Sequence, residues 1–147
     1  MATRTARTAW NGTLQEGSGQ VELSSSKIGT YEVSWPRRAG DEANGVTSPE
    51  ELIAAAHSSC FAMAMSGEVA RAGGTPQSLD VTADVSFGPD EKGGGYAIGG
   101  IRLTVRGRVE GLDGAGFQKA AQAAKAGCPV SKALTGVQIT VDAALER

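Results

Sequence analysis

The chain has 147 residues, 40% of them hydrophobic and 20% charged, which is a globular composition and excludes a disordered or fibrous protein. Its net charge of −2 offers no basic surface for nucleic acid, and its two cysteines and single histidine are too few for a secreted disulfide scaffold or a zinc cluster. No apolar segment typical of secretory signals follows the N-terminal arginines, and no apolar stretch favours a membrane span. We therefore expect a single cytoplasmic domain, residues 1–147, with no nucleic-acid partner and no membrane contact.

The N-terminal third is predicted to form strands. Apolar residues partly alternate over Arg7–Leu14, Gln20–Ser24 and Thr30–Trp35, and glycines or serines separate these segments. The following segment, Arg37–Thr47, is polar and contains two glycines and four charged residues, so we expect an exposed loop there.

A long helix is predicted from Pro49 to about Arg71. Ser48 can cap its start, proline suits its first position, and Glu51 stands three residues after Ser48 as in a capping box. The pair Gly73-Gly74 is typical of a helix end.

The middle of this helix, Leu52–Met65, is apolar or small on every side, which predicts burial on every side. One sheet in a chain of this size covers only one side of a helix, so we expect a second copy of the chain to cover the other. Small residues would let two such helices approach closely; they are Ala54, Ala55, Ala56, Ser58, Ser59, Ala62 and Ala64.

The C-terminal half is predicted to contain three strands, one helix and one further helical turn. In chain order these are Leu79–Phe87, Tyr96–Val109, Gly114–Ala126, Ser131–Leu134 and Val137–Leu145. We expect a turn over 88–95, a bulge at Gly99-Gly100 and a helix cap at Asp113. The order β-β-β-α-β-β-α-β indicates an α+β fold with a mainly antiparallel sheet.

Cys60 is the first candidate for chemistry, although a cysteine in an apolar helix is usually an inert core residue. Its thiolate would need a cation, and no lysine lies on this helix. The candidates are Arg37 and Arg38, since arginine stays charged in a dry site, although loop arginines are more often simply solvated. His57, three residues before Cys60, could act as a base, but a satisfied core histidine is the simpler interpretation.

Glu50 and Glu51 differ in their expected roles. Glu51 suits the capping box, which leaves Glu50 to orient an arginine. Ten residues of helix separate Glu50 from Cys60, or about 15 Å along the axis. If both belong to one active site, a partner chain must supply one of them.

Cys128 follows a predicted helix and precedes Pro129 and Ser131, which could cap the next helical turn. A cysteine at such a position could be exposed enough to attack a sulfenic acid. The alternative is a small buried residue without chemistry.

Two motifs in this sequence resemble those of the OsmC/Ohr family of organic hydroperoxide reductases. The first is Thr47-Ser48-Pro49-Glu50-Glu51-Leu52-Ile53-Ala54-Ala55-Ala56-His57-Ser58-Ser59-Cys60-Phe61, and the second is Lys125-Ala126-Gly127-Cys128-Pro129-Val130-Ser131. The resemblance spans nearly the whole chain. The Ala-Ala-His sequence before Cys60 resembles the OsmC branch, because the Ohr branch carries an aromatic residue at the position of His57.

The resemblance implies an intertwined homodimer with a curved sheet, two principal helices per subunit and two active sites at the interface. It implies that Cys60 is the peroxidatic cysteine and Cys128 the resolving cysteine. It also implies a thiolate-holding arginine paired with Glu50. The OsmC branch places this arginine three residues after an aromatic, so Trp35 selects Arg38, with Arg37 as the neighbouring alternative.

The activity that the resemblance implies is reduction of organic hydroperoxides, in protection against oxidative or osmotic stress. Cys60 would become a sulfenic acid, Cys128 would close a disulfide, and an external dithiol, a dihydrolipoyl group by resemblance, would restore both thiols. No metal, haem or flavin is expected. Apolar groups near Cys60, such as Phe61, Met63 and Ile53, would favour organic peroxides. The alternatives are a redox sensor or small-ligand-binding protein of the same fold, and a structural protein with two core cysteines.

Overall fold

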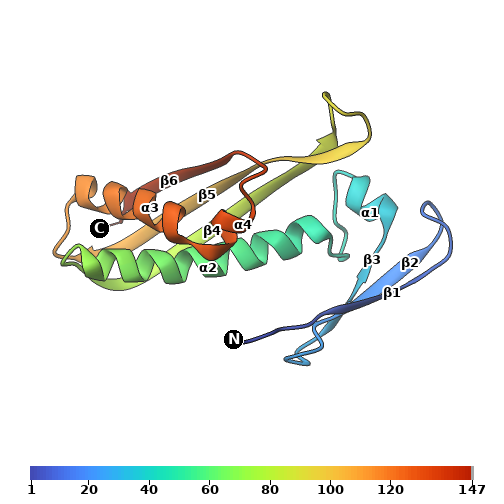
Figure 1. Ribbon diagram of the computed structural model, residues 1–147, viewed down its shortest axis with the longest axis horizontal. Coiled ribbons are helices and arrows are strands. Elements are labelled where there is room, and N and C mark those ends of the chain that lie inside the picture. The colour runs from blue at the N-terminus through green and yellow to red at the C-terminus, as the bar shows by residue number, and fades with distance from the viewer. Residues whose placement is uncertain (147) are drawn as a thin grey trace. The chain divides into compact units, whose positions relative to one another are not determined.

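The computed structural model describes residues 1–146 and confirms an α+β chain. Its elements in order are β1 (Arg7–Asn11), β2 (Ser18–Glu22), β3 (Thr30–Val33), α1 (Trp35–Ala39), α2 (Pro49–Arg71), β4 (Thr75–Pro89), β5 (Tyr96–Glu110), α3 (Gly114–Gly127), α4 (Pro129–Ala133) and β6 (Ile139–Leu145) (Figure 1). The chain separates into two compact units, residues 1–52 and residues 53 onward, which are described here one at a time.

The first unit is built on a three-stranded antiparallel sheet in the order β1-β2-β3. The first strand is shorter than predicted and ends at Asn11. The unit has little core of its own, because Val21 is the one hydrophobic residue that is buried among the described residues up to position 52. Trp10, Tyr31 and Ile28 are exposed by 40%, 42% and 72%. A sheet this thin needs a further apolar surface for stability.

Two predictions are wrong where they meet. The strand predicted to reach Trp35 ends earlier, and the loop predicted over Arg37–Thr47 begins within a helix. Strand β3 ends at Val33, and the short helix α1 occupies Trp35–Ala39. The Ser34 side chain caps it by accepting from the backbone N–H of Arg37, and Pro36 lies in its first turn. Strand propensity of the tryptophan was overridden by this local capping chemistry.

Helix α2 begins and ends as predicted. Ser48 Oγ accepts from the backbone N–H of Glu51, although the Glu51 carboxylate binds the Thr47 hydroxyl, so only half of a capping box forms. At the other end Gly73 has a φ of +94°, and Gly74 N–H donates to the Val69 carbonyl. These are the features of a Schellman cap, in which a left-handed residue ends the helix.

The second unit contains a separate three-stranded sheet in the order β4-β5-β6. The long strands β4 and β5 pair antiparallel, whereas β6 pairs parallel to β5, because α3 and α4 carry the chain back across the sheet. The chain therefore forms two small sheets, one of which is mixed. The register shift at Ser86/Phe87 skips Gly99 on β5, which confirms the predicted bulge.

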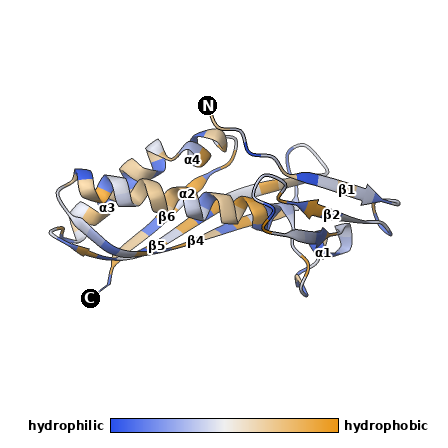
Figure 2. Ribbon diagram, turned by 90° about the horizontal axis from the view of Figure 1, so that it is seen from below, coloured by the Kyte–Doolittle hydropathy of each residue, from blue (hydrophilic) through white to orange (hydrophobic). Residues whose placement is uncertain are grey.

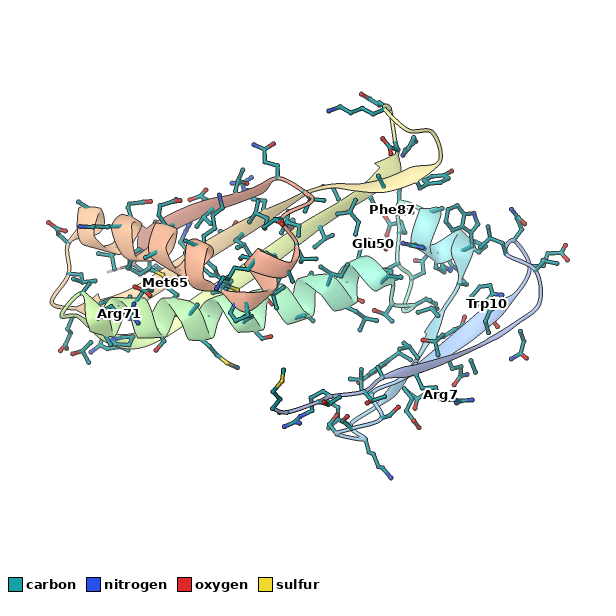
Figure 3. All side chains as sticks on the ribbon, in the orientation of Figure 1. Arg7, Trp10, Glu50, Met65, Arg71 and Phe87 are labelled. Carbon is teal, nitrogen blue, oxygen red and sulfur yellow. The ribbon has the colours of Figure 1, made fainter. Side chains whose placement is uncertain are left out.

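Helices α2 and α3 lie on one face of the β4-β5-β6 sheet, and apolar residues concentrate between the two layers (Figures 1 and 2). Met65, which points from α2 toward α3 in Figure 3, is fully buried there with Phe61 and Phe117. Phe117 packs closely on β5 because Gly107 has no side chain; a Cβ there would lie 2.9 Å from its ring.

Burial of α2 on every side does not occur within the chain. Ala55, Ala56, Ser59 and Met63 are exposed, and Met63 is 75% exposed, while the opposite side of the helix is packed in the core. The remaining face of the helix is thus apolar and uncovered. None of the helices in residues 1–146 is both long and apolar enough to cross a membrane.

Candidate active site

The second unit brings Cys60 and Cys128 together, although 68 positions separate them in the sequence. Their Sγ atoms lie 3.1 Å apart, both as free thiols. Cys60 is half-buried in the middle of α2, and Cys128 is fully buried at the junction of α3 and α4. Pro129 starts α4 and ends α3, which holds Cys128 extended between them and turns its side chain toward α2.

The sequence predicted that Ser131 could cap the helical turn after Cys128. This prediction is wrong, because the N-cap residue of α4 is Cys128 itself. The Cys128 thiol makes no capping hydrogen bond, but the amides of the first turn lie near enough to stabilise its thiolate.

The two thiols differ in acidity within the chain. Burial raises the pKa of the Cys60 thiol, and the neighbouring Cys128 raises it further. Burial acts in the same direction on Cys128, but its pKa is lowered overall because the amides of Ser131 and Val130, the Ser131 hydroxyl and the Cys60 thiol favour its thiolate. Among the groups around the two thiols in residues 1–146, the Val130 amide lowers the pKa of Cys60, but burial and Cys128 outweigh it.

His57 pairs with Ser131, 74 positions away, rather than with Cys60. Its Nε2 lies 2.7 Å from Ser131 Oγ, and both residues are buried. The other ring nitrogen, Nδ1, is buried without a hydrogen-bond partner in the described chain. Burial lowers the pKa of His57, so the imidazole is neutral at pH 7. Sequence spacing pointed to Cys60, and no local signal could have identified Ser131.

The first unit brings Arg38 and Glu50 together in a bidentate ion pair. Arg38 Nε donates to both carboxylate oxygens at 3.0 and 3.2 Å, and Nη2 donates to Oε1 at 2.8 Å. The Glu50 side chain is only 9% exposed and points toward α1 from the first turn of α2 (Figure 3). Helix α1 positions the arginine, and α2 positions the carboxylate.

Arg37 takes no part in this ion pair. Its backbone N–H serves the α1 cap, and its side chain makes none of the contacts with Glu50. Of the two candidate arginines, Arg38 is thus the one that the buried glutamate orients.

An apolar cavity of about 200 Å³ lies in the second unit. Ile53, which is seven residues before Cys60 and on the same side of α2, lines it together with residues of β5 and of the chain after α4. A larger hollow of about 770 Å³ borders β6, but it is lined mainly by polar side chains such as Lys125 and Gln138. Phe61 lines neither, since it is a core residue. No three His, Cys, Asp or Glu side chains within residues 1–146 cluster as metal ligands.

Comparison with known proteins decides the family. The family described as OsmC-like protein matches residues 40–142, which include both cysteines. The chain belongs to the OsmC/Ohr family. It is 42% identical over 133 residues to peroxiredoxin OsmC of Escherichia coli strain K12, covering 90% of each chain. It is also 32% identical over 124 residues to the organic hydroperoxide resistance protein OhrA of Bacillus subtilis, covering 83% of this chain and 85% of that relative.

Solved structures of the OsmC/Ohr family share the fold. The organic hydroperoxide resistance protein OhrB of Bacillus subtilis is 26% identical and superimposes with a TM-score of 0.72, covering 97% of this chain and 98% of that one. A second organic hydroperoxide resistance protein, from Elizabethkingia anophelis, is 24% identical with a TM-score of 0.74 and shows the likeness of fold alone. The predicted fold class, with its two principal helices α2 and α3, is thereby confirmed.

Proposed function

We propose that this protein is a thiol peroxidase that reduces organic hydroperoxides to alcohols, with Cys60 as the peroxidatic and Cys128 as the resolving cysteine. The observation that carries the proposal is the thiol pair itself: two free cysteines with sulfurs 3.1 Å apart, one half-exposed and one buried. The relatives named peroxiredoxin and organic hydroperoxide resistance protein support the same chemistry.

The exposure of the two cysteines supports this division of roles. A peroxide arriving from solvent meets Cys60 first, because Cys128 is fully buried behind it. The Cys60 thiolate attacks the distal peroxide oxygen, the O–O bond breaks, and the alkoxide leaves and takes a proton to become the alcohol. Cys60 is then a sulfenic acid, and Cys128 lies close enough to condense with it to a disulfide, releasing water.

Arg38 and Glu50 supply the missing positive charge in this proposal. The pKa of Cys60 is raised in the chain alone, so its thiolate needs a cation. Glu50 stands ten residues before Cys60 on α2, which corresponds to about 15 Å of helix. The pair therefore serves the Cys60 of a partner subunit, as the family resemblance implies.

A homodimer follows from the same reasoning. The apolar face of α2 around Met63 is uncovered, and the first unit has almost no core among its described residues. A second copy could cover both surfaces and complete two active sites with Arg38 and Glu50 of the opposite subunit. The dimer is expected to be obligate, since each chain lacks part of its own core.

The apolar cavity near Ile53 supports organic hydroperoxides as the substrate class. It would receive the hydrocarbon part of an organic hydroperoxide, a group that hydrogen peroxide lacks. The proposed reductant is an external dithiol such as a dihydrolipoyl group, which returns both cysteines to thiols by disulfide exchange. We place the protein in the cytoplasm, where such dithiols are kept reduced.

The decisive experiment mixes the purified protein with cumene hydroperoxide and dihydrolipoamide and follows the loss of peroxide. We expect catalytic turnover, faster than with hydrogen peroxide, and none with Cys60→Ser. A Cys128→Ser variant should complete one oxidation of Cys60 but should not form the internal disulfide. Equal peroxide loss in the wild type and Cys60→Ser would refute the proposal.

A further inference from the structure

A row of polar side chains leads inward from Cys60 through Cys128 and Ser131 to His57. Cys60 Sγ contacts Cys128 Sγ at 3.1 Å, and Ser131, three residues after Cys128 in the first turn of α4, lowers the pKa of the Cys128 thiol through its hydroxyl. Ser131 Oγ in turn lies 2.7 Å from His57 Nε2. Cys60 is half-exposed, whereas Cys128, Ser131 and His57 are buried, with exposures of 0%, 4% and 0%.

His57, at the inner end of this row, lowers the stability of the fold. His57 Nδ1 is buried with no hydrogen-bond partner in the described chain, and a buried polar atom left unpaired is unfavourable by about 1–3 kcal/mol. An apolar residue would fill the same place without that cost. A neutral imidazole, however, has a ring nitrogen that can accept a proton, which an apolar residue lacks.

His57 is not placed to serve Cys60. Its side chain has one hydrogen bond within residues 1–146, to Ser131, which stands three residues after Cys128 in the first turn of α4. The proton that this arrangement can move is therefore that of the buried resolving cysteine. Cys128 has no exposed surface from which water could remove its proton.

We propose that His57, acting through the Ser131 hydroxyl, is the general base that deprotonates Cys128 when the disulfide closes. The inference rests on the proposed peroxidase function and concerns only its second step. In this proposal His57 and Ser131 do not contact the peroxide. They act only on the proton of Cys128.

The proton and electron changes balance as follows. The Cys128 S–H proton passes to Ser131 Oγ while the Ser131 proton passes to His57 Nε2. The Cys128 sulfur attacks Cys60, the S–S bond forms, and the S–O bond of the sulfenic acid breaks. The departing hydroxide takes a proton from solvent and leaves as water. When a dithiol later reduces the disulfide, His57 returns its proton to the Cys128 thiolate along the same path.

The test separates oxidation of Cys60 from closure of the disulfide. Fully reduced protein is mixed with a stoichiometric amount of cumene hydroperoxide and quenched at intervals with a sulfenic-acid trap, and the species are counted by mass spectrometry. The variants are His57→Gln, Ser131→Ala and the double variant. Gln can still bond to Ser131 but cannot take a proton. Ser58→Ala is the matched control, because the Ser58 hydroxyl donates to the Ala55 carbonyl of its own helix.

We expect Cys60 oxidation within about twofold of wild type in every variant, and closure slowed roughly tenfold to hundredfold in His57→Gln and in Ser131→Ala. The double variant should be no slower than the slower single variant, because both residues serve one path. The longer-lived sulfenic acid should also be lost more readily to sulfinic acid under excess peroxide.

Closure at wild-type rate in folded His57→Gln and Ser131→Ala would overturn the relay and leave the peroxidase proposal intact. Equal slowing of both steps would also overturn it, since a merely structural role predicts that result. A wild-type protein whose Cys60 does not react would overturn the peroxidase proposal itself, and the relay with it. Circular dichroism melting of each variant establishes that it is folded.

Discussion

The Arg38–Glu50 pair gives the sharpest test of how the first unit is built, through the variant Arg38→Ala. Removing the arginine leaves the Glu50 carboxylate buried without its counter-ion, with a side chain only 9% exposed. Breaking a fully buried pair costs about 3–5 kcal/mol. The Arg38 side chain is 33% exposed, so solvent screens part of the interaction, and we expect a loss of about 2 kcal/mol.

That loss corresponds to a fall in melting temperature of roughly 4–8 °C for a chain of this size. Glu50→Gln should lose about 1 kcal/mol, because its neutral amide leaves no buried charge. The double variant Arg38→Ala/Glu50→Gln should lose no more than Arg38→Ala alone, which gives a coupling of about 1 kcal/mol. Arg37→Ala is the matched control and should change stability by less than about 0.5 kcal/mol.

The assay is urea unfolding followed by circular dichroism at one fixed protein concentration, since the proposed dimer would make stability depend on concentration. Equal losses in Arg38→Ala and Arg37→Ala, or additive effects of Arg38 and Glu50, would show that the buried ion pair is not the organising contact. A second readout is the acidity of Cys60 in a Cys128→Ser background. Its pKa should rise in Arg38→Ala and stay unchanged in Arg37→Ala.

Three further predictions concern stability. Gly73→Ala should destabilise by about 1–2 kcal/mol in thermal melts, because φ is +94° there. Ser48→Ala should cost about 1 kcal/mol by the same measurement, since it removes the cap of α2. The pKa of His57 is lowered in the folded state, so the unfolded state binds more protons as pH falls through its ordinary value of 6.5. Stability should decline with acidification below that pH, and the slope should be smaller in His57→Gln; identical slopes would contradict a neutral buried imidazole.

Most of the fold could be predicted because its signals are local. Ser48 and Asp113 accept hydrogen bonds from residues three positions later, and Gly73 ends α2, each within one turn of helix. The bulge at Gly99 also followed from two adjacent glycines in a strand. Such features depend on residues that are neighbours in sequence, so the sequence pattern contains them.

The features that sequence reasoning missed depend on packing between distant segments. The pairing of His57 with Ser131 spans 74 positions and exists because α4 presents its first turn to α2. Helix α1 was missed because it has only five residues and begins with a tryptophan, which favours strands. The parallel edge strand β6 follows from the return of the chain through α3 and α4, which periodicity within a strand does not reveal.

The cysteines show why the fold of one chain does not complete the chemistry. Within the chain, the neighbouring amides and hydroxyl lower the pKa of buried Cys128, while the pKa of the more exposed Cys60 is raised. This order suits the second step of the proposed cycle, in which Cys128 would become a nucleophile, but not the first, in which Cys60 would already be one. A positive charge from outside this environment has to reverse it. The first unit holds such a charge in Arg38, fixed by Glu50, on a part of the chain with too little core to stand alone. Dimerisation would then serve stability and reactivity through one contact, because covering the exposed surface is also what would bring the guanidinium to the thiol.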